Sequence, residues 1–204
     1  MLRLDRCVIE NGTFRLSADL GLKPGHIVAV IGPSGEGKTT LLEAIAGFLP
    51  LAEGEITWDG KPLSPLAPGA RPVAMLFQDG NLFPHLSAEQ NAGLGLDPRL
   101  KLSRADRARV SEALDRVGLT GLGRRKPGAL SGGQRARVAL ARLMVQRRAI
   151  VLLDEPFAAL GPALKAEMLA LVKHLAQETG ATVLMVSHDP EDARRVADQV
   201  IFVR

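Results

Sequence analysis

A glycine-rich stretch constrains the fold of this chain more than any other part of it: V-A-V-I-G-P-S-G-E-G-K-T-T, residues 28–40. Residues 28–31 are apolar and mostly β-branched, which predicts a short buried strand. Residues 32–39 then fit G-x-x-x-x-G-K-[ST], the pattern of a phosphate-binding loop. Its glycines permit backbone angles that let several N–H groups turn toward one anion. Apolar residues at helical spacing between Leu41 and Leu49 predict that a helix begins near Lys38.

The chemistry expected of this loop is phosphate binding. The N-terminus of a helix carries partial positive charge and unpaired N–H donors. Lys38 is expected to reach the β- and γ-phosphates, and Thr39 to place its hydroxyl on Mg²⁺. The candidate nucleotide-binding residues are Gly32, Pro33, Ser34, Gly35, Glu36, Gly37, Lys38, Thr39 and Thr40. A plain glycine-rich turn is the alternative interpretation, but the strand before the loop and the helix after it favour phosphate binding.

Composition excludes several classes of protein. The 204 residues are 46% hydrophobic, enough for one sizeable core, and a single cysteine allows no internal disulfide. We find neither a signal-peptide core nor an apolar run of about 18 residues, the minimum for a membrane span. We therefore expect a soluble protein that reaches a membrane only through a partner. The net charge is +4, but the arginines follow helical patterns and aromatics are 3%, so we expect no nucleic-acid partner.

Strands and helices alternate along the chain. Expected strands lie at 55–58, 73–77, 150–153 and 182–186, and expected helices at 103–117, 131–146 and 164–175, after short strand pieces in 1–25 and a turn at Glu53-Gly54. This alternation predicts an α/β fold with a mainly parallel sheet and helices on both faces, preceded by N-terminal antiparallel β pieces. Residues 79–147 lose the strand pattern. We interpret the chain as one domain, 1–204, with a core at 1–78 and 148–204 and an inserted helical subdomain at 79–147.

Two acids follow the predicted strand I-V-L-L at 150–153. In a protein with a phosphate loop, the end of a neighbouring strand is where a second magnesium contact is needed. Asp154 fits that position, with Thr39 as the other protein ligand. Glu155 can orient or deprotonate the attacking water, a contribution of about 10²–10⁴-fold in rate. The alternative is an ordinary solvated loop start, which the phosphate loop upstream disfavours.

The sequence L-S-G-G-Q at 130–134 is a second candidate anion site. Ser131 can cap a helix whose first residues are glycines, so that backbone N–H groups stay accessible. One chain already holds a complete loop for one triphosphate. A second site makes sense if it serves the nucleotide of another copy of the chain, although a plain capped helix also fits this sequence.

Together these motifs resemble the ATP-binding cassette ATPases over essentially the whole chain. The matching segments, in order, are Gly32–Thr40, Gln78, Leu130–Gln134, Ile150–Glu155 and Ser187–Asp189. The resemblance implies a P-loop NTPase core that uses ATP and Mg²⁺, in a head-to-tail dimer with ATP at the interface. It implies that Ser131, Gly132, Gly133 and Gln134 contact the ATP of the partner copy. It also implies that Gln78 contacts Mg²⁺ and the attacking water, and that His188 touches the γ-phosphate, so Glu155, His188 and Gln78 are the expected catalytic residues.

A finer resemblance concerns residues 72–96, which look like the ATPase subunits of bacterial solute importers. The run from Asn81 to Leu96, with D-P-R-L-K-L after it, is most similar to thiamine-importer ATPases. This implies uptake of thiamine or thiamine phosphates through a membrane permease at the cytoplasmic face of the bacterial inner membrane. A periplasmic or extracellular solute-binding protein would be an indirect partner. Alternatives are an importer of an inorganic ion, polyamine or sugar, a cassette ATPase acting on nucleic acid or ribosomes, and a small-molecule kinase, which would leave L-S-G-G-Q unexplained.

The sequence departs from the family pattern in three places. The family stacks an early aromatic residue on the adenine, whereas residues 8–13 contain none, and Phe14 has the pattern of a strand residue. Gly161 stands where the family has an aspartate, so communication across a dimer is expected to be weaker. The family also continues with a hairpin and a helix after the position of Val203, so we expect a short or truncated version.

Overall fold

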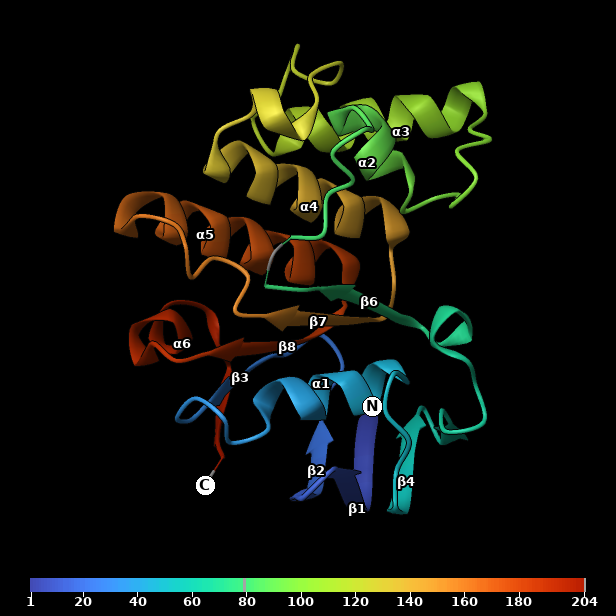
Figure 1. Cartoon of the computed structure of the whole chain (residues 1–204), viewed down its shortest axis with the longest axis vertical. Helices are drawn as coiled ribbons and strands as arrows, with labels where there is room; N and C mark the ends of the chain where they lie inside the picture. The colour runs from blue at the N-terminus through green and yellow to red at the C-terminus, as the bar shows by residue number, and fades with distance from the viewer. Residues whose placement is uncertain (79, 204) are drawn as a thin grey trace.

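A five-stranded parallel sheet, in the strand order β6-β7-β8-β3-β9, lies at the centre of the molecule (Figure 1). The computed structural model describes residues 1–78 and 80–203. Asp79, where the predicted helical subdomain begins, and Arg204 lie outside the described residues. The strands of the sheet are β6 (Val73–Leu76), β7 (Ile150–Asp154), β8 (Thr182–Ser187), β3 (Ile27–Ile31) and β9 (Gln199–Phe202). The strands predicted at 73–77, 150–153 and 182–186 are therefore confirmed.

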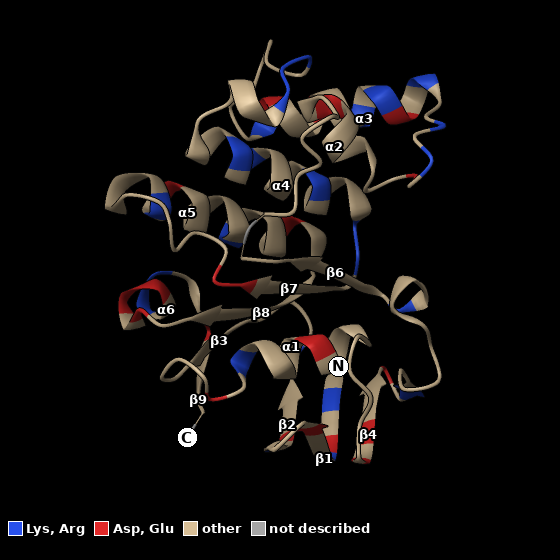
Figure 2. Ribbon diagram, in the orientation of Figure 1, with Lys and Arg blue, Asp and Glu red and all other residues tan. Residues whose placement is uncertain are grey.

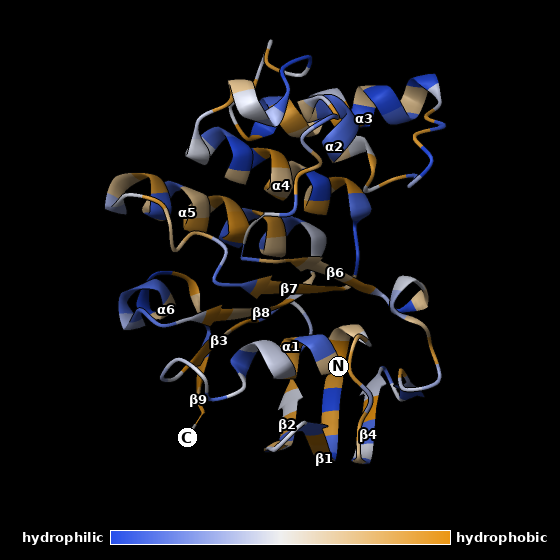
Figure 3. Ribbon diagram, viewed as in Figure 1, coloured by the Kyte–Doolittle hydropathy of each residue, from blue (hydrophilic) through white to orange (hydrophobic). Residues whose placement is uncertain are grey.

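Helices cover both faces of this sheet, as predicted. Helix α1 (Lys38–Ala46) packs on one face with β-strand residues such as Val30 and Leu152. Helix α5 (Pro162–Thr179) packs on the other face, against residues such as Leu153 and Val183, and α6 (Pro190–Val196) contacts β3 and β8 on that side. Successive strand residues point to opposite faces, and every residue of β3, β7 and β8 is buried. Continuous apolar strands are typical of a parallel sheet covered on both faces, and Figure 3 shows these strands as strongly hydrophobic.

A separate antiparallel sheet lies beyond α1, in the order β2-β1-β4-β5. Its strands are β1 (Leu2–Asn11), β2 (Phe14–Leu22), β4 (Glu53–Trp58) and β5 (Lys61–Pro62). The first two are long strands of 10 and 9 residues, more than the short pieces predicted from the sequence. The predicted turn at Glu53-Gly54 is wrong, because both residues open β4. Gly54 has φ +83° and faces a bulge in β1, where an added Cβ would lie 2.3 Å from the carbonyl oxygen of Arg6.

Between β6 and β7 the described residues form three α-helices: α2 (Ala88–Gly93), α3 (Arg104–Arg116) and α4 (Gly132–Gln146). A short 3₁₀ turn, η2 (Pro127–Ala129), lies in the same segment, and another, η1 (Pro68–Ala70), precedes β6. The helices expected at 103–117 and 131–146 are confirmed, while the limits of a helical subdomain remain a prediction. Figure 1 shows this layer beyond α5, on the side of the sheet opposite α1. None of the helices in the described residues has the length and apolar character needed to span a membrane.

Lys and Arg residues are frequent on this helical layer (Figure 2). Several of them join helices: Arg137 pairs with Glu167 of α5, and Arg116 pairs with Glu178 near the end of the same helix. Arg142 donates hydrogen bonds to the backbone and side-chain oxygens of Asn91 in α2. The positive charge of this layer therefore contributes to its packing.

Candidate functional site

The phosphate-binding loop lies between β3 and α1, as the motif predicts. Gly35 has φ +89° and Gly37 has φ +81°, in the left-handed region that glycine adopts without strain. Gly37 is also the N-cap residue of α1 and, having no side chain, makes no side-chain cap for this helix. The first turn of a helix has N–H groups without intrahelical partners. The N-terminus of α1 is therefore left to a ligand, in the arrangement that suits an anion.

Lys38 lies inside this loop. Its side chain is buried, and its Nζ donates hydrogen bonds to the carbonyl oxygens of Gly32 at 2.9 Å and Pro33 at 2.5 Å. The ammonium group is thus curled back over the loop, where two carbonyl dipoles compensate its charge. A phosphate in the loop would provide a stronger partner, because it carries full negative charge whereas the two carbonyl oxygens offer only dipoles.

Thr39 and Asp154 come together from distant parts of the sequence. The Thr39 hydroxyl lies 3.1 Å and 3.0 Å from the two carboxylate oxygens of Asp154. Asp154 is only 6% exposed, and burial raises the pKa of its carboxyl, an effect that the hydrogen bond from Thr39 offsets in part. A hydroxyl and a carboxylate are hard oxygen donors of the kind that Mg²⁺ prefers. Within residues 1–78 and 80–203 there is no cluster of three or more His, Cys, Asp or Glu that could hold a metal, so a cation here would also need oxygens of the substrate.

Glu155 and His188 also meet, from the ends of β7 and β8. The His188 Nδ1 lies 3.1 Å from the Glu155 Oε2. Glu155 has φ +42°, a left-handed conformation that is uncommon for a residue with a side chain. Its backbone N–H donates to the carbonyl oxygen of Val186 at 3.1 Å, which helps to hold this conformation. Backbone strain of this kind is concentrated at functional sites.

His188 also faces the phosphate-binding loop. It lines an open pocket of about 540 Å³ together with Gly32, Pro33 and Ser34. Residues from β3, the loop, the end of β8 and the end of β9 thus converge at one edge of the sheet. In open α/β sheets, ligands bind at this carboxyl edge of the strands.

Gln78 is exposed, two residues after the end of β6. Strand β6 pairs with β7 in parallel, with Leu76 opposite Leu153. Gln78 therefore follows the strand neighbouring Asp154, at the same edge of the sheet. Its contact with a metal or with water stays a prediction.

The L-S-G-G-Q segment begins α4. The Ser131 hydroxyl accepts a hydrogen bond from the Gln134 N–H at 3.2 Å, and the Gln134 side chain accepts one from the Ser131 N–H at 3.0 Å. The predicted cap is therefore confirmed as a capping box. A Cβ on Gly133 would lie 2.2 Å from the Leu164 side chain of α5, so close packing of α4 on α5 requires this glycine. Since α4 and α1 lie on opposite sides of the parallel sheet (Figure 1), the segment is remote from the phosphate loop of its own chain.

Phe14 is a residue whose position the sequence did not reveal. It opens β2, as expected of a strand residue, but its ring lies against the phosphate loop. A Cβ on Gly37 would lie 2.5 Å from the Phe14 Cζ. This long-range contact depends on how the antiparallel sheet packs, for which the local sequence offers no signal.

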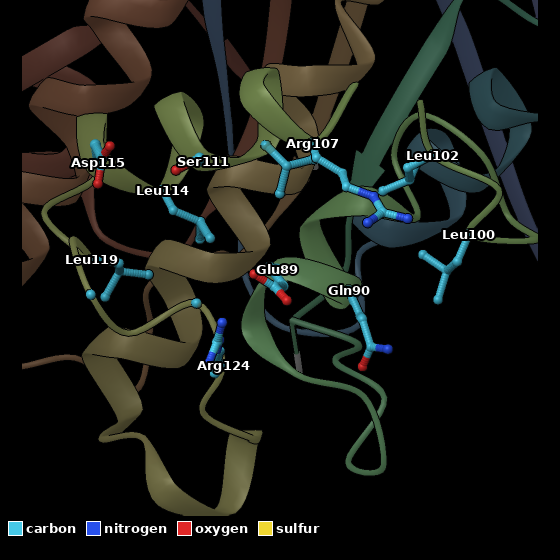
Figure 4. Close-up of a pocket in the computed structure, with 13 residues that line it drawn as sticks. Glu89, Gln90, Leu100, Leu102, Arg107, Ser111, Leu114, Asp115, Leu119 and Arg124 are labelled. Carbon is cyan, nitrogen blue, oxygen red and sulfur yellow. The ribbon is translucent and has the colours of Figure 1, made fainter. Parts of the chain in front are cut away.

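A separate pocket of about 500 Å³ lies in the helical layer (Figure 4). Leu102, Leu114 and Leu119 form part of its apolar wall, and the charged residues Arg107 and Arg124 also line it. It contains none of the predicted nucleotide-binding residues. The predicted site residues instead gather at the sheet edge and at the start of α4.

Comparison with known proteins places these features in a family. The family model described as ABC transporter matches residues 17–158. The thiamine import ATP-binding protein ThiQ of Cereibacter sphaeroides is 64% identical over 203 residues, which span 100% of this chain and 88% of that protein. ThiQ of a Ruegeria species gives the same identity and coverage. A dimeric ATP-binding cassette solved in a post-hydrolysis state with ADP and Pi superimposes with a TM-score of 0.86 at 30% identity, covering 100% of this chain and 94% of that one.

Proposed function

Since the chain belongs to the ABC transporter family of ATP-hydrolysing cassettes, we propose that it is the ATPase subunit of a bacterial importer of thiamine or thiamine phosphates. The 64% identity to ThiQ proteins over 203 residues carries this proposal. The solute would pass through a membrane permease, and the chain would turn over ATP at the cytoplasmic face of the inner membrane. A solute-binding protein would act on the other side of that permease.

The geometry supports a division of roles among the site residues. Hydrolysis joins water to the γ-phosphorus and breaks its bond to the β-phosphate oxygen, which yields ADP and phosphate. Glu155 orients the attacking water and accepts its proton, while His188 holds the Glu155 carboxylate and contacts the γ-phosphate. Lys38 neutralises the β- and γ-phosphates. Mg²⁺, when bound, would supply further positive charge there, and Thr39, Asp154 and Gln78 would hold it.

A second copy of the chain completes the site. The start of α4 is remote from its own phosphate loop, and Ser131 and Gly132 are exposed. A hydroxyl can accept one hydrogen bond and still donate another, so the Ser131 O–H remains able to donate to a phosphate of the partner's ATP. The similar solved cassettes are described as dimeric, which supports a head-to-tail dimer with two ATP molecules at its interface.

Uptake of labelled thiamine tests the proposed function. Cells that lack this gene should take up little thiamine, and the parent gene should restore uptake. The Glu155→Gln variant should reach the membrane fraction in equal amount without restoring it. Normal thiamine uptake in the deletion strain would contradict the thiamine assignment.

The same variant tests the ATPase assignment in the purified protein. Glu155→Gln should bind ATP as the parent does, while its hydrolysis falls by about 10²–10⁴-fold because the general base is lost. Hydrolysis near the parent rate would show that another group accepts the proton.

A further inference from the structure

An ion cluster joins the first turn of α5 to α6, beside the proposed catalytic pair. The Lys165 Nζ lies 2.7 Å from the Asp192 Oδ1 and 3.0 Å from the Asp189 Oδ2. The side chain of Lys165 is 17% exposed and that of Asp192 is 8% exposed. Removing one partner from a buried pair is costly, because it leaves the other charge without compensation. The cluster therefore fixes α6 against α5.

The two acids of this cluster fix the backbone on either side of His188: Asp189 directly follows it, and Asp192 binds Ser187, which precedes it. Asp192 accepts a hydrogen bond from the Ser187 hydroxyl at 2.5 Å. Asp189 is the N-cap of α6, where its carboxylate accepts from the Glu191 N–H at 2.9 Å. Ser187 and Asp189 immediately precede and follow His188, so the backbone of the histidine is anchored on both sides through Lys165.

The imidazole of His188 itself has much less support. It is 59% exposed, and its contact with the Glu155 carboxylate at 3.1 Å is the interaction that orients it. Because more than half of the ring is exposed, its position also depends on the backbone turn that carries it. Glu155, Lys165 and His188 also line one small pocket, which places the cluster next to the reacting groups.

We propose that Lys165 is a positioning residue for ATP hydrolysis. Its ammonium group holds Asp189 and Asp192, these acids fix the turn 187–189, and the turn presents His188 to Glu155. The inference rests on the proposed roles of Glu155 and His188. Lys165 also donates its backbone N–H to the carbonyl oxygen of Gly161 at 2.9 Å, so it links the His188 turn to the segment that follows Glu155.

Steady-state ATPase kinetics of the purified full chain test this role. Lys165→Met keeps the length of the side chain and removes its charge. It should lower kcat by about 10- to 100-fold, the effect of a catalytic group displaced by about 1 Å, with KM for ATP within about twofold of the parent. Lys165→Arg keeps a cation and should recover most of the lost kcat.

Arg137→Met provides a matched control. Arg137 is 18% exposed and pairs at 2.7 Å with Glu167 of α5. It also donates to the carbonyl oxygen of Val117, and neither partner belongs to the turn 187–189 or to α6. We expect it to lose stability without a comparable loss of kcat. Equal losses of kcat in both variants would overturn the inference, as would a parent-like kcat for Lys165→Met.

The proposed action of Lys165 through His188 has its own test. In a His188→Ala background, Lys165→Met should cause little further loss of kcat, because the residue on which it acts is gone. A full additive loss would overturn the inference. If Lys165→Met does not fold, the double variant Lys165→Met/Asp192→Asn removes the unpaired buried charge. It should fold with a reduced kcat, and a parent-like kcat in it would also overturn the inference.

The Glu155→Gln variant distinguishes failure of the inference about Lys165 from failure of the proposed function. If Glu155→Gln abolishes hydrolysis and Lys165→Met does not change it, the inference about Lys165 fails and the proposed function stands. If Glu155→Gln hydrolyses ATP at the parent rate, the proposed catalytic pair itself fails.

Discussion

Two helices of this molecule begin at proposed anion sites, and their first turns are built differently. Helix α1 starts after Gly37, which has no side chain to offer to the unpaired N–H groups. Helix α4 starts at Ser131, where a capping box with Gln134 satisfies donors within the chain itself. A helix start has about four N–H groups without intrahelical partners. Helix α1 leaves these groups to a ligand, whereas in α4 the capping box already satisfies some of them.

The difference indicates which site binds first. The N-terminus of α1 gains its hydrogen bonds only when an anion is present, so nucleotide affinity should reside there. The start of α4 is already stable and has fewer donors left to offer. In the proposed dimer, it is therefore suited to sense a phosphate already bound by the partner copy.

Among the variants that test this difference between the two helix starts, Lys38→Ala should have the largest effect on ATP affinity. Loss of a charge-assisted contact of about 1.5–3 kcal/mol should weaken ATP binding by about 10- to 150-fold. Titration of the purified protein with a fluorescent ATP analogue measures it. Lys173→Ala, at an exposed position of α5, removes the same charge elsewhere and should bind normally. Unchanged affinity in Lys38→Ala would place the main phosphate site outside this loop.

Ser131→Ala should have an intermediate effect, which falls on stability and ATPase activity and not on the ATP affinity of the isolated chain. Loss of the cap should lower the free energy of unfolding by about 1 kcal/mol, while the ATP affinity of the isolated chain stays unchanged. ATPase activity at protein concentrations that allow pairing should fall. Ser103→Ala removes the same type of capping box from α3 and should cost similar stability without that loss. A fall in ATP affinity as large as that of Lys38→Ala would show that the two helix starts contribute equally to ATP binding by the isolated chain.

The smallest effect should come from Phe14→Ala. The Phe14 ring lies against Gly37, beside the first turn of α1, where it can stack on a nucleotide base. Aromatic stacking contributes about 0.5–1.5 kcal/mol, so ATP should bind roughly 2- to 10-fold more weakly. Inorganic tripolyphosphate has no base, and its affinity should not change. An equal loss for both ligands would mean that the ring only supports the loop.

Local patterns predicted most of the core and the residues that meet in the candidate site. Strand β7 and helix α1 follow from apolar runs and the glycine motif, and the motif also placed Thr39 beside Asp154 across 115 residues. What the sequence did not reveal depends on pairing between distant segments. Glu53-Gly54 has the composition of a turn, but pairing with β1 draws both residues into β4, so long-range hydrogen bonds override the local preference.

The same limit applies to the cluster around Lys165. A lysine in the first turn of an amphipathic helix is an ordinary solvated residue by its sequence. Its partners Asp189 and Asp192 become neighbours only because α6 packs next to α5 in the folded chain. No spacing within the sequence distinguishes such a lysine from Lys173, which is exposed on the same helix.

The buried carboxyl of Asp154 has a consequence for how the candidate site would bind a cation. Burial raises its pKa, so between the ordinary pKa of an aspartate and the raised value the folded protein retains a proton that the unfolded chain releases. In that range, a divalent cation can take Asp154 as a ligand only by displacing the proton. Cation binding is then linked to proton release, and protons compete with the cation for one carboxylate. Acidification of the purified chain into that range should therefore weaken Mg²⁺ binding, with the phosphate-binding loop itself unchanged.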